Sequence, residues 1–269
     1  MELLFALDAL SAPEYGIVCA VAVVAMLYAS VGHAGATGYI AVLTLAGMAP
    51  IEVRPTALVL NVIVAAIGSV QFFRAGHFRW SLFAPLAAGS IPCAMLGGSL
   101  PLQPRTIELV VALVLFGVAV QLLIPQKLPR EPEPNSDSDL KSFHKGFFQI
   151  FSSWKMTLVA AGIGLLSGCT GVGGGVFLTP ILIALRKAPI KTIAAVTAPF
   201  ILVNSLAGLA GSILGDQRVP PLAPTFMIAA ILGGAIGSSL GATRLSAMAI
   251  RRLLAVVLGI ASFKLFGHF

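Results

Sequence analysis

Long apolar runs dominate this chain and leave it few ways to fold. We identify ten of them, and charged residues occur only near their ends. Charged residues make up 10% of the sequence, against about 25% in soluble domains. A bilayer offers no water to backbone N–H and C=O groups, so runs of this length predict an all-helical, multi-pass membrane protein. The runs lie at 16–31, 37–48, 56–73, 82–100, 107–124, 156–167, 173–185, 193–214, 224–240 and 250–266.

Two of these runs, 37–48 and 173–185, are too short to span a membrane, because a spanning helix needs about 20 residues. Each follows a glycine-rich break, SVGHAGATG at 30–38 and SGCTGVGGG at 167–175. Glycine destabilises a helix interior by about 1 kcal/mol relative to alanine, so both breaks interrupt a helix. We therefore predict two half-helices, which begin near Gly38 and near Gly175.

The same motifs return in the same order in the two halves of the chain. API at 49–51 returns at 188–190, GGSL at 97–100 returns as GSSL at 237–240, and Asn61 has a counterpart in Asn204. This order predicts a duplication. We expect a first repeat at 1–124, a polar linker at 125–155 and a second repeat at 156–269.

The basic residues predict how the repeats are oriented. With all ten runs counted as crossings and the N-terminus outside, most Lys and Arg fall on inside connections, including the linker. Positive charge marks the cytoplasmic side, so the linker is expected in the cytoplasm and both termini outside. The second repeat is then inverted relative to the first. This pattern also accounts for the net charge of +7 without any binding of nucleic acid.

Inverted repeats with short, broken helices indicate a secondary transporter with a binding site near the midplane. A helix N-terminus presents free N–H groups and a partial positive charge, which favour an anion. Glycine lets the backbone approach a ligand closely. The alternative is that the glycines only allow tight helix packing. The candidate contacts with the substrate are Gly35, Thr37, Gly38, Asn61, Thr170, Gly171, Gly173, Gly174, Gly175 and Asn204.

Several side chains in and near the breaks allow two interpretations. His33 is a candidate proton site or an interfacial residue, and Cys169 is a substrate contact or a structural thiol. The Asn and Thr candidates either contact solute or bond backbone. Arg54, near Glu52, is expected to form an interfacial ion pair or to be an anion-attracting rim charge. No Asp or Glu lies deep in a run, so we predict neither a metal site nor a cofactor.

These motifs resemble the TauE/SafE sulfite exporter family. The resemblance lies in SVGHAGATGYI at 30–40 and SGCTGVGGGVFLTPIL at 167–182, each followed by an Ala-Pro-Ile turn. It covers nearly the whole chain except the linker. The first motif has Ala34 and Ala36 where family members often have glycine. The resemblance implies an inner-membrane permease that moves sulfite, sulfoacetate or other sulfur-containing or organic anions, usually outward.

We therefore expect a permease that exports a small anion by alternating access, without catalytic residues. Coupling to a proton or a sodium ion stays open, as do the substrate and the oligomeric state. One rival is a membrane-embedded enzyme with Cys169 or Ser167 as nucleophile and His33 as base. Another is an anion channel or a scaffold that does not transport.

Overall fold

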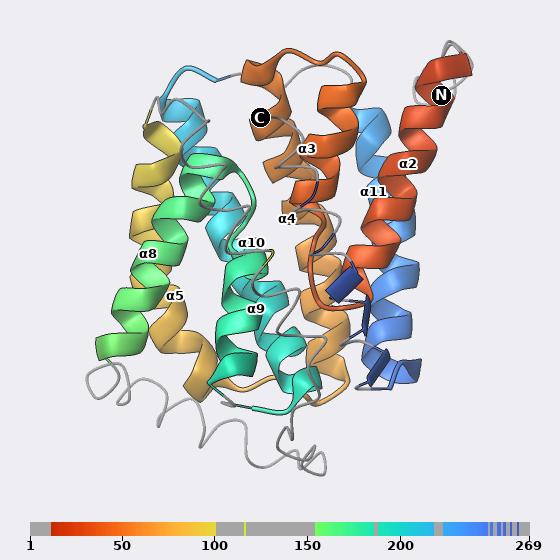
Figure 1. Cartoon of the computed structure of the whole chain (residues 1–269). Helices are drawn as coiled ribbons and strands as arrows, with labels where there is room; N and C mark the ends of the chain where they lie inside the picture. Colours follow the sequence, from red (N-terminus) through yellow and green to blue (C-terminus); the bar gives the residue numbers. More distant parts are fainter. Residues whose placement is uncertain are drawn as a thin grey trace.

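The computed structural model describes residues 12–100, 154–185, 188–217 and 223–246, together with Phe116 and short pieces between 248 and 263. All regular elements in these ranges are helical (Figure 1), which confirms the predicted fold class. The helices are α2 (Ala12–Ala29), α3 (Ala36–Leu45), α4 (Pro50–Arg74), α5 (Trp80–Ser99), α8 (Trp154–Thr170), α9 (Gly175–Ala184), α10 (Ile190–Leu214) and α11 (Ala223–Ser239), followed by a π-helical turn, Leu240–Arg244.

Eight of the ten predicted runs correspond to these helices. The fifth run, at 107–124, lies outside the described residues apart from Phe116, and only scattered residues of the tenth run are described. The predicted linker also lies outside them up to residue 153. Its last two residues, Trp154 and Lys155, are helical, because α8 begins at Trp154.

Four described helices are long and apolar enough to cross a membrane. They are Ile51–Arg74, Trp80–Ser99, Ile190–Leu214 and Thr225–Arg244. Apolar side chains on the outer faces of the helices, such as Leu96, Leu158 and Leu232, are exposed. Exposed leucines in spanning helices are suited to contact with lipid tails.

The short helices α3 and α9 fold back on the helices that precede them. Each has 10 residues, about 15 Å at 1.5 Å per residue, or half of a hydrocarbon core of about 30 Å. Gly38 of α3 lies against Val24 and Tyr28 of α2, and Gly174 lies against Ile163 of α8. In Figure 1, α3 leads back to the end of the molecule where α2 begins, and α9 to the opposite end, where α8 begins.

The pairs α2–α3 and α8–α9 are therefore re-entrant hairpins, a possibility that the sequence left open. A hairpin returns the chain to the side from which it came, just as two complete crossings do. The hairpins alone therefore do not change which connections share a side, and the orientation inferred from the charge pattern stays a prediction. What changes is the depth of the breaks, which form the turns of the two hairpins inside the molecule.

Glycines bring outer helices of the first half close to outer helices of the second half. The backbone of α5 contacts that of α8 where Gly97 meets the carbonyl of Leu165, and α11 contacts α2 where Gly237 meets the carbonyl of Met26. Such small residues allow helix backbones to approach closely in membranes. The central helices α4 and α10 pack against each other and against these outer pairs.

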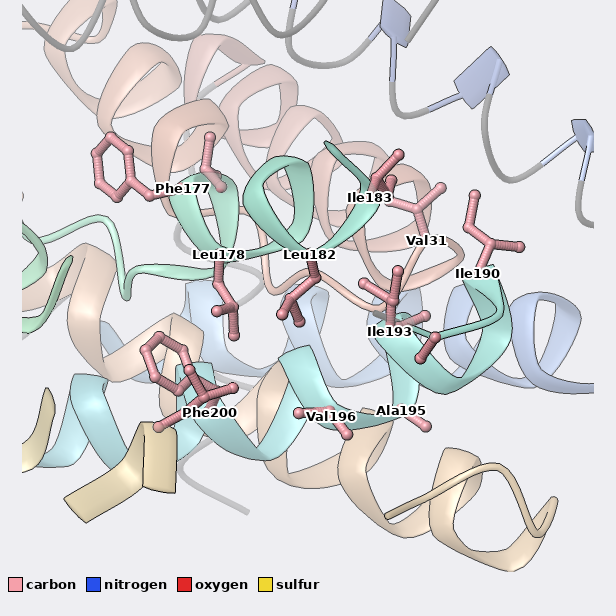
Figure 2. Packing of buried hydrophobic residues seen from close by; sticks show 14 of the residues in the cluster. Val31, Phe177, Leu178, Leu182, Ile183, Ile190, Ile193, Ala195, Val196 and Phe200 are labelled. Carbon is pink, nitrogen blue, oxygen red and sulfur yellow. The ribbon is translucent and has the colours of Figure 1, made fainter. Parts of the chain in front are cut away.

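The buried side chains form two clusters, one around α8, α9 and α10 and the other around α2, α3, α4 and α11. In Figure 2, Leu178 and Leu182 of α9 point towards Phe200 and Val196 of α10. Val31, which belongs to the first break, is part of this same cluster. The first break is thus buried against the second half of the chain.

We predict opposite effects of alanine at two glycines of α8. A Cβ atom at Gly164 would overlap the Ser90 carbonyl, whereas nothing lies within 4 Å of one at exposed Gly162. Gly164→Ala should destabilise the protein by about 1–3 kcal/mol through overpacking. Gly162→Ala should leave stability unchanged or raise it by up to about 1 kcal/mol through helix propensity. Thermal unfolding in detergent measures both, and equal effects would contradict this close contact.

Candidate functional site

Both breaks depend on backbone conformations that favour glycine. In the second break Gly171, Gly173 and Gly174 have φ of +76°, +77° and +79°, and in the first Gly32 and Gly35 have +78° and +102°. Side chains strain this left-handed region. Gly35 and Gly174 are the residues immediately before α3 and α9. α9 begins at Gly175 as predicted, whereas α3 begins at Ala36, two residues earlier than predicted.

The N-termini of these two half-helices have no side-chain cap. Neither Gly35 nor Gly174 provides a capping hydrogen bond, and no acidic residue lies in the first turn of either helix. The first N–H groups of a helix lack partners within it and carry a partial positive charge. Two uncapped N-termini at interior hairpin turns are suited to bind a negatively charged group.

His33 brings the two breaks together. Its side chain is only 3% exposed, which corrects the interfacial alternative. The imidazole Nδ1 lies 3.4 Å from the carbonyl oxygen of Val31, and the ring also lies beside the backbone of Gly175. Its Nε2 atom is buried without a hydrogen-bond partner in the structure. A polar ring of the first hairpin therefore lies at the start of α9.

Asn61 of α4 supports the unwound backbone of the second break. Its Nδ2 atom donates to the carbonyl oxygen of Val172 and to Oγ of Ser205, both at 3.4 Å. A carbonyl can only accept, so this contact fixes the orientation of the amide. The Oδ1 atom then faces away from both and is buried without a partner in the structure. Asn61 thus bonds backbone, as one interpretation predicted, and keeps one acceptor for a ligand.

Asn204 is not the structural counterpart of Asn61. The helices α4 and α10 are both 25 residues long, but Asn204 lies nearly one turn further along its helix. Its Nδ2 donates to the carbonyl of Phe200 at 2.8 Å and to Oγ of Ser90 at 3.0 Å. The sequence match between the two amides is therefore out of register. Asn204 connects α10 to α5, and its buried Oδ1 also lacks a partner.

The threonine candidates make local bonds. Thr170 Oγ1 donates to the carbonyl of Leu166 in its own helix at 2.7 Å. The hydroxyls of Thr37 and Tyr28 lie 2.7 Å apart, which connects α3 to α2. Gly38 likewise packs against α2. These residues hold the hairpins together, and their contacts favour the structural interpretation over direct contact with solute.

The remaining glycines of the second break have no room for a side chain. A Cβ atom at Gly173 would lie 2.6 Å from Nδ2 of Asn61 and 2.8 Å from Oγ of Ser205. One at Gly175 would lie 2.8 Å from Cγ2 of Thr197. Ser167, behind Gly174, is completely buried and its hydroxyl lacks a hydrogen-bond partner in the structure. The second break is therefore closely packed, with polar atoms of Asn61 and Ser205 against Gly173 and apolar carbons of Ile201 against Gly175.

Comparison with known proteins identifies the group to which this architecture belongs. The family model for the sulfite exporter TauE/SafE matches residues 17–265. The chain belongs to the TauE/SafE family. It is also 35% identical over 221 residues to the probable membrane transporter protein y4hK of Sinorhizobium fredii (strain NBRC 101917 / NGR234), which covers 79% of this chain and 82% of that protein. No solved structure matches.

The TauE/SafE match decides between the broad functional classes. The family and the relative are both described as membrane transporters, so this protein is a multi-pass membrane transporter and not an enzyme. The two residues suggested as nucleophiles, Ser167 and Cys169, lie in different surroundings. Ser167 is fully buried against the second break, and Cys169 is a half-buried free thiol at the end of α8.

Arg54 of this TauE/SafE protein has other partners than the sequence suggested. It was expected to form an ion pair or a rim charge beside Glu52. Its Nη2 atom instead donates to the carbonyls of Gly97 at 3.1 Å, Gly98 at 2.7 Å and Gly168. Its position near the N-terminal end of a helix that is long and apolar enough to span a membrane was the available signal, since ionisable residues in spanning helices are expensive and usually functional.

We predict that Gly173→Ala is far more damaging than Gly47→Ala. Both glycines have nearly the same φ, +77° and +79°, so both alanines pay about 1–2 kcal/mol for the left-handed conformation. Only Gly173 lies against buried polar atoms, whereas nothing lies within 4 Å of a Cβ at Gly47. Gly173→Ala should therefore lower thermal stability or ligand binding well beyond Gly47→Ala. Similar values in unfolding and binding assays would contradict the close approach at Gly173.

Proposed function

We propose that this protein exports a small anion across the inner membrane by alternating access, with sulfite or an organosulfonate as the substrate. The observation that carries this proposal is that both half-helices, α3 and α9, begin at buried and uncapped glycine turns, at Gly35 and Gly174. His33 connects them spatially, since its ring belongs to one break and lies beside Gly175 of the other. Backbone N–H groups of the breaks bind the anion's oxygens.

The buried side chains around the second break suit an anion that also carries a proton. Asn61 keeps a buried Oδ1 that only a donor or a cation can satisfy. Hydrogensulfite, the protonated form of sulfite, has oxygens that accept from the backbone and an acidic hydrogen that can be donated to Oδ1. The buried hydroxyl of Ser167 and Nε2 of His33 supply further polar contacts. A fully deprotonated sulfonate uses the N–H groups but leaves Oδ1 unsatisfied.

Alternating access requires two similar structures that open to opposite sides, and the contacts of the two halves support this arrangement. The contact between Gly171 and Arg54 of α4 has a counterpart between Gly32 and Ala194 of α10. The α2–α3 and α8–α9 hairpins also enter from opposite ends (Figure 1). We propose that the repeats at 1–124 and 156–269 are inverted and rock against each other about the central helices.

The proposed orientation places the linker at 125–155 in the cytoplasm and both termini outside, following the positive charges. An anion that leaves a negative cytoplasm gains about 2.3 kcal/mol per charge for each 100 mV of membrane potential. Export therefore needs no coupling ion to be favourable. Coupling to a proton at His33 or to sodium would serve accumulation against this gradient, and the proposal does not require it.

We predict that Gly174→Leu abolishes anion flux in proteoliposomes while the protein still inserts. A Cβ at Gly174 would lie 3.0 Å from Phe200, 3.2 Å from Ile163 and 3.3 Å from Ser167, and φ is +79°. The leucine should displace the start of α9 and reduce sulfite flux at least tenfold. Gly47→Leu is the matched control, because it has the same φ and open surroundings.

The outcome separates the mechanisms. Saturable sulfite counterflow in the wild type and in Gly47→Leu, with none in Gly174→Leu, supports a transporter that uses the second break. Full flux in a correctly inserted Gly174→Leu variant would remove this break from the mechanism. Flux that does not saturate would indicate a channel.

We further predict that Asn61→Ala weakens sulfite binding more than Asn204→Ala. Asn61 offers its free acceptor beside the second break, whereas Asn204 connects α10 to α5. Loss of one hydrogen bond to a charged group costs about 1.5–3 kcal/mol, which is roughly a 10- to 100-fold rise in Kd. Ligand-induced thermal shifts with sulfite and with a sulfonate measure this. An equal rise in Kd for sulfite and for the sulfonate would contradict the proposal that Asn61 recognises the proton of hydrogensulfite.

A further inference from the structure

We propose that Arg54 recognises the negative charge of the transported anion at the second break and gives the transporter its selectivity for anions. This inference rests on the anion transport proposed above and names the residue that senses the charge. Its guanidinium is held by backbone carbonyls in the structure, and an anion competes with these carbonyls for it.

Arg54 and Asn61 lie on the same face of α4. They are seven residues apart, which is almost two full turns of helix. The stem of Arg54 crosses Gly171, where a Cβ atom would lie 2.8 Å from its Cγ. Asn61 bonds the carbonyl of Val172. One face of α4 therefore follows the second break from Gly171 to Gly173.

The hydrogen bonding of the Arg54 guanidinium is incomplete, and an anion can supply better acceptors. Its Nη2 atom faces three carbonyls, those of Gly97, Gly98 and Gly168, although one guanidinium nitrogen carries only two hydrogens at that end. These carbonyls belong to the last turns of α5 and α8, where helix dipoles are negative. The Nε atom is buried and has no hydrogen-bond partner in the structure.

Within the described part of the chain, carbonyl dipoles compensate the positive charge of Arg54, and no acidic side chain does so. No carboxylate there forms an ion pair with Arg54. A guanidinium pairs best with two oxygens of one planar or tetrahedral anion, through parallel and charge-assisted hydrogen bonds. Bound sulfite or a sulfonate can supply such oxygens, and carbonyl groups on separate helices cannot do so with the same geometry.

A comparison of the two halves of the chain distinguishes charge recognition by Arg54 from simple packing. Gly32 in the first break contacts Ala194 of α10 in the way that Gly171 contacts Arg54 of α4. The first contact forms with alanine, so a glycine break can pack on a central helix without an arginine. Arg54 therefore adds a charge to one side of an otherwise repeated contact. That charge makes the second break the preferred site for the anion's negative group.

Cys169 provides a reporter for this charge. It is a half-buried free thiol, it interacts electrostatically with Arg54, and its backbone nitrogen lies near Gly97, whose carbonyl binds Arg54. In a Cys19→Ser and Cys93→Ser background, labelling with an anionic and a cationic methanethiosulfonate of similar size compares the local potential. The rate at which each reagent labels Cys169 is divided by the rate at which the same reagent labels a free thiol in solution.

The experiment uses the full-length protein in detergent and compares Arg54→Gln, Arg54→Lys and Arg74→Gln. Arg74 is the matched control, because it lies at the exposed end of the same helix. In the wild type, we expect Cys169 to prefer the anionic reagent about tenfold. Arg54→Gln should bring this preference towards one and weaken sulfite binding at least tenfold. Arg54→Lys should keep the preference but bind sulfite more weakly, and Arg74→Gln should change neither.

Each other outcome overturns a specific claim. Sulfite binding that survives Arg54→Gln, or a labelling preference that this variant leaves unchanged, refutes charge recognition by Arg54 while anion transport stands. A Cys169 that reacts with neither reagent places this face away from any path open to anions and refutes the inference as well. A wild-type protein that neither binds nor transports any anion refutes the proposed function itself.

Discussion

The structure depends on how a membrane protein can bury an interrupted helix. Unpaired backbone groups are expensive in lipid, so a break must be enclosed by protein. Here each break is enclosed by the other half of the chain: Gly32 lies on Ala194 of α10, and Gly171 lies on Arg54 of α4. Each half therefore covers the helix break of the other half. The same enclosure places the N-termini of α3 and α9 inside the molecule, where we propose that the anion binds.

Small residues make this enclosure possible at every level. At the outer pairs, glycine brings backbone against backbone, as between Gly97 and Leu165. At the breaks, glycine supplies the left-handed conformations of Gly35 and Gly174. These are different physical uses of one residue type. The packing interpretation consequently holds for the glycines of the outer pairs, whereas binding by the glycines of the breaks stays a prediction.

The lengths of the apolar runs and the glycine breaks made much of the fold predictable from sequence. The helices and the two half-helices follow from run lengths and glycine density, and Gly175 was correctly placed at a helix start. The relative position of Asn61 and Asn204 could not be predicted, because a shift of nearly one turn keeps both on a similar face of their helices. The partners of Arg54 could not be predicted either. They are carbonyls on α5 and α8, and every residue has a carbonyl, so the sequence carries no mark of these contacts.

The chemistry of the site arises where the two halves differ. Matching contacts build two similar hairpin turns, and a symmetric protein would offer an anion two equal sites. Arg54 on α4 occupies the position that Ala194 occupies on α10, because each contacts a glycine of a break. Asn61 bonds the backbone of the second break, whereas Asn204 bonds Ser90. Both differences place polar groups of α4 at the second break. In the mechanism that we propose, a charged ligand consequently has one preferred position, and the repeated backbone lets the surrounding helices adopt two related arrangements.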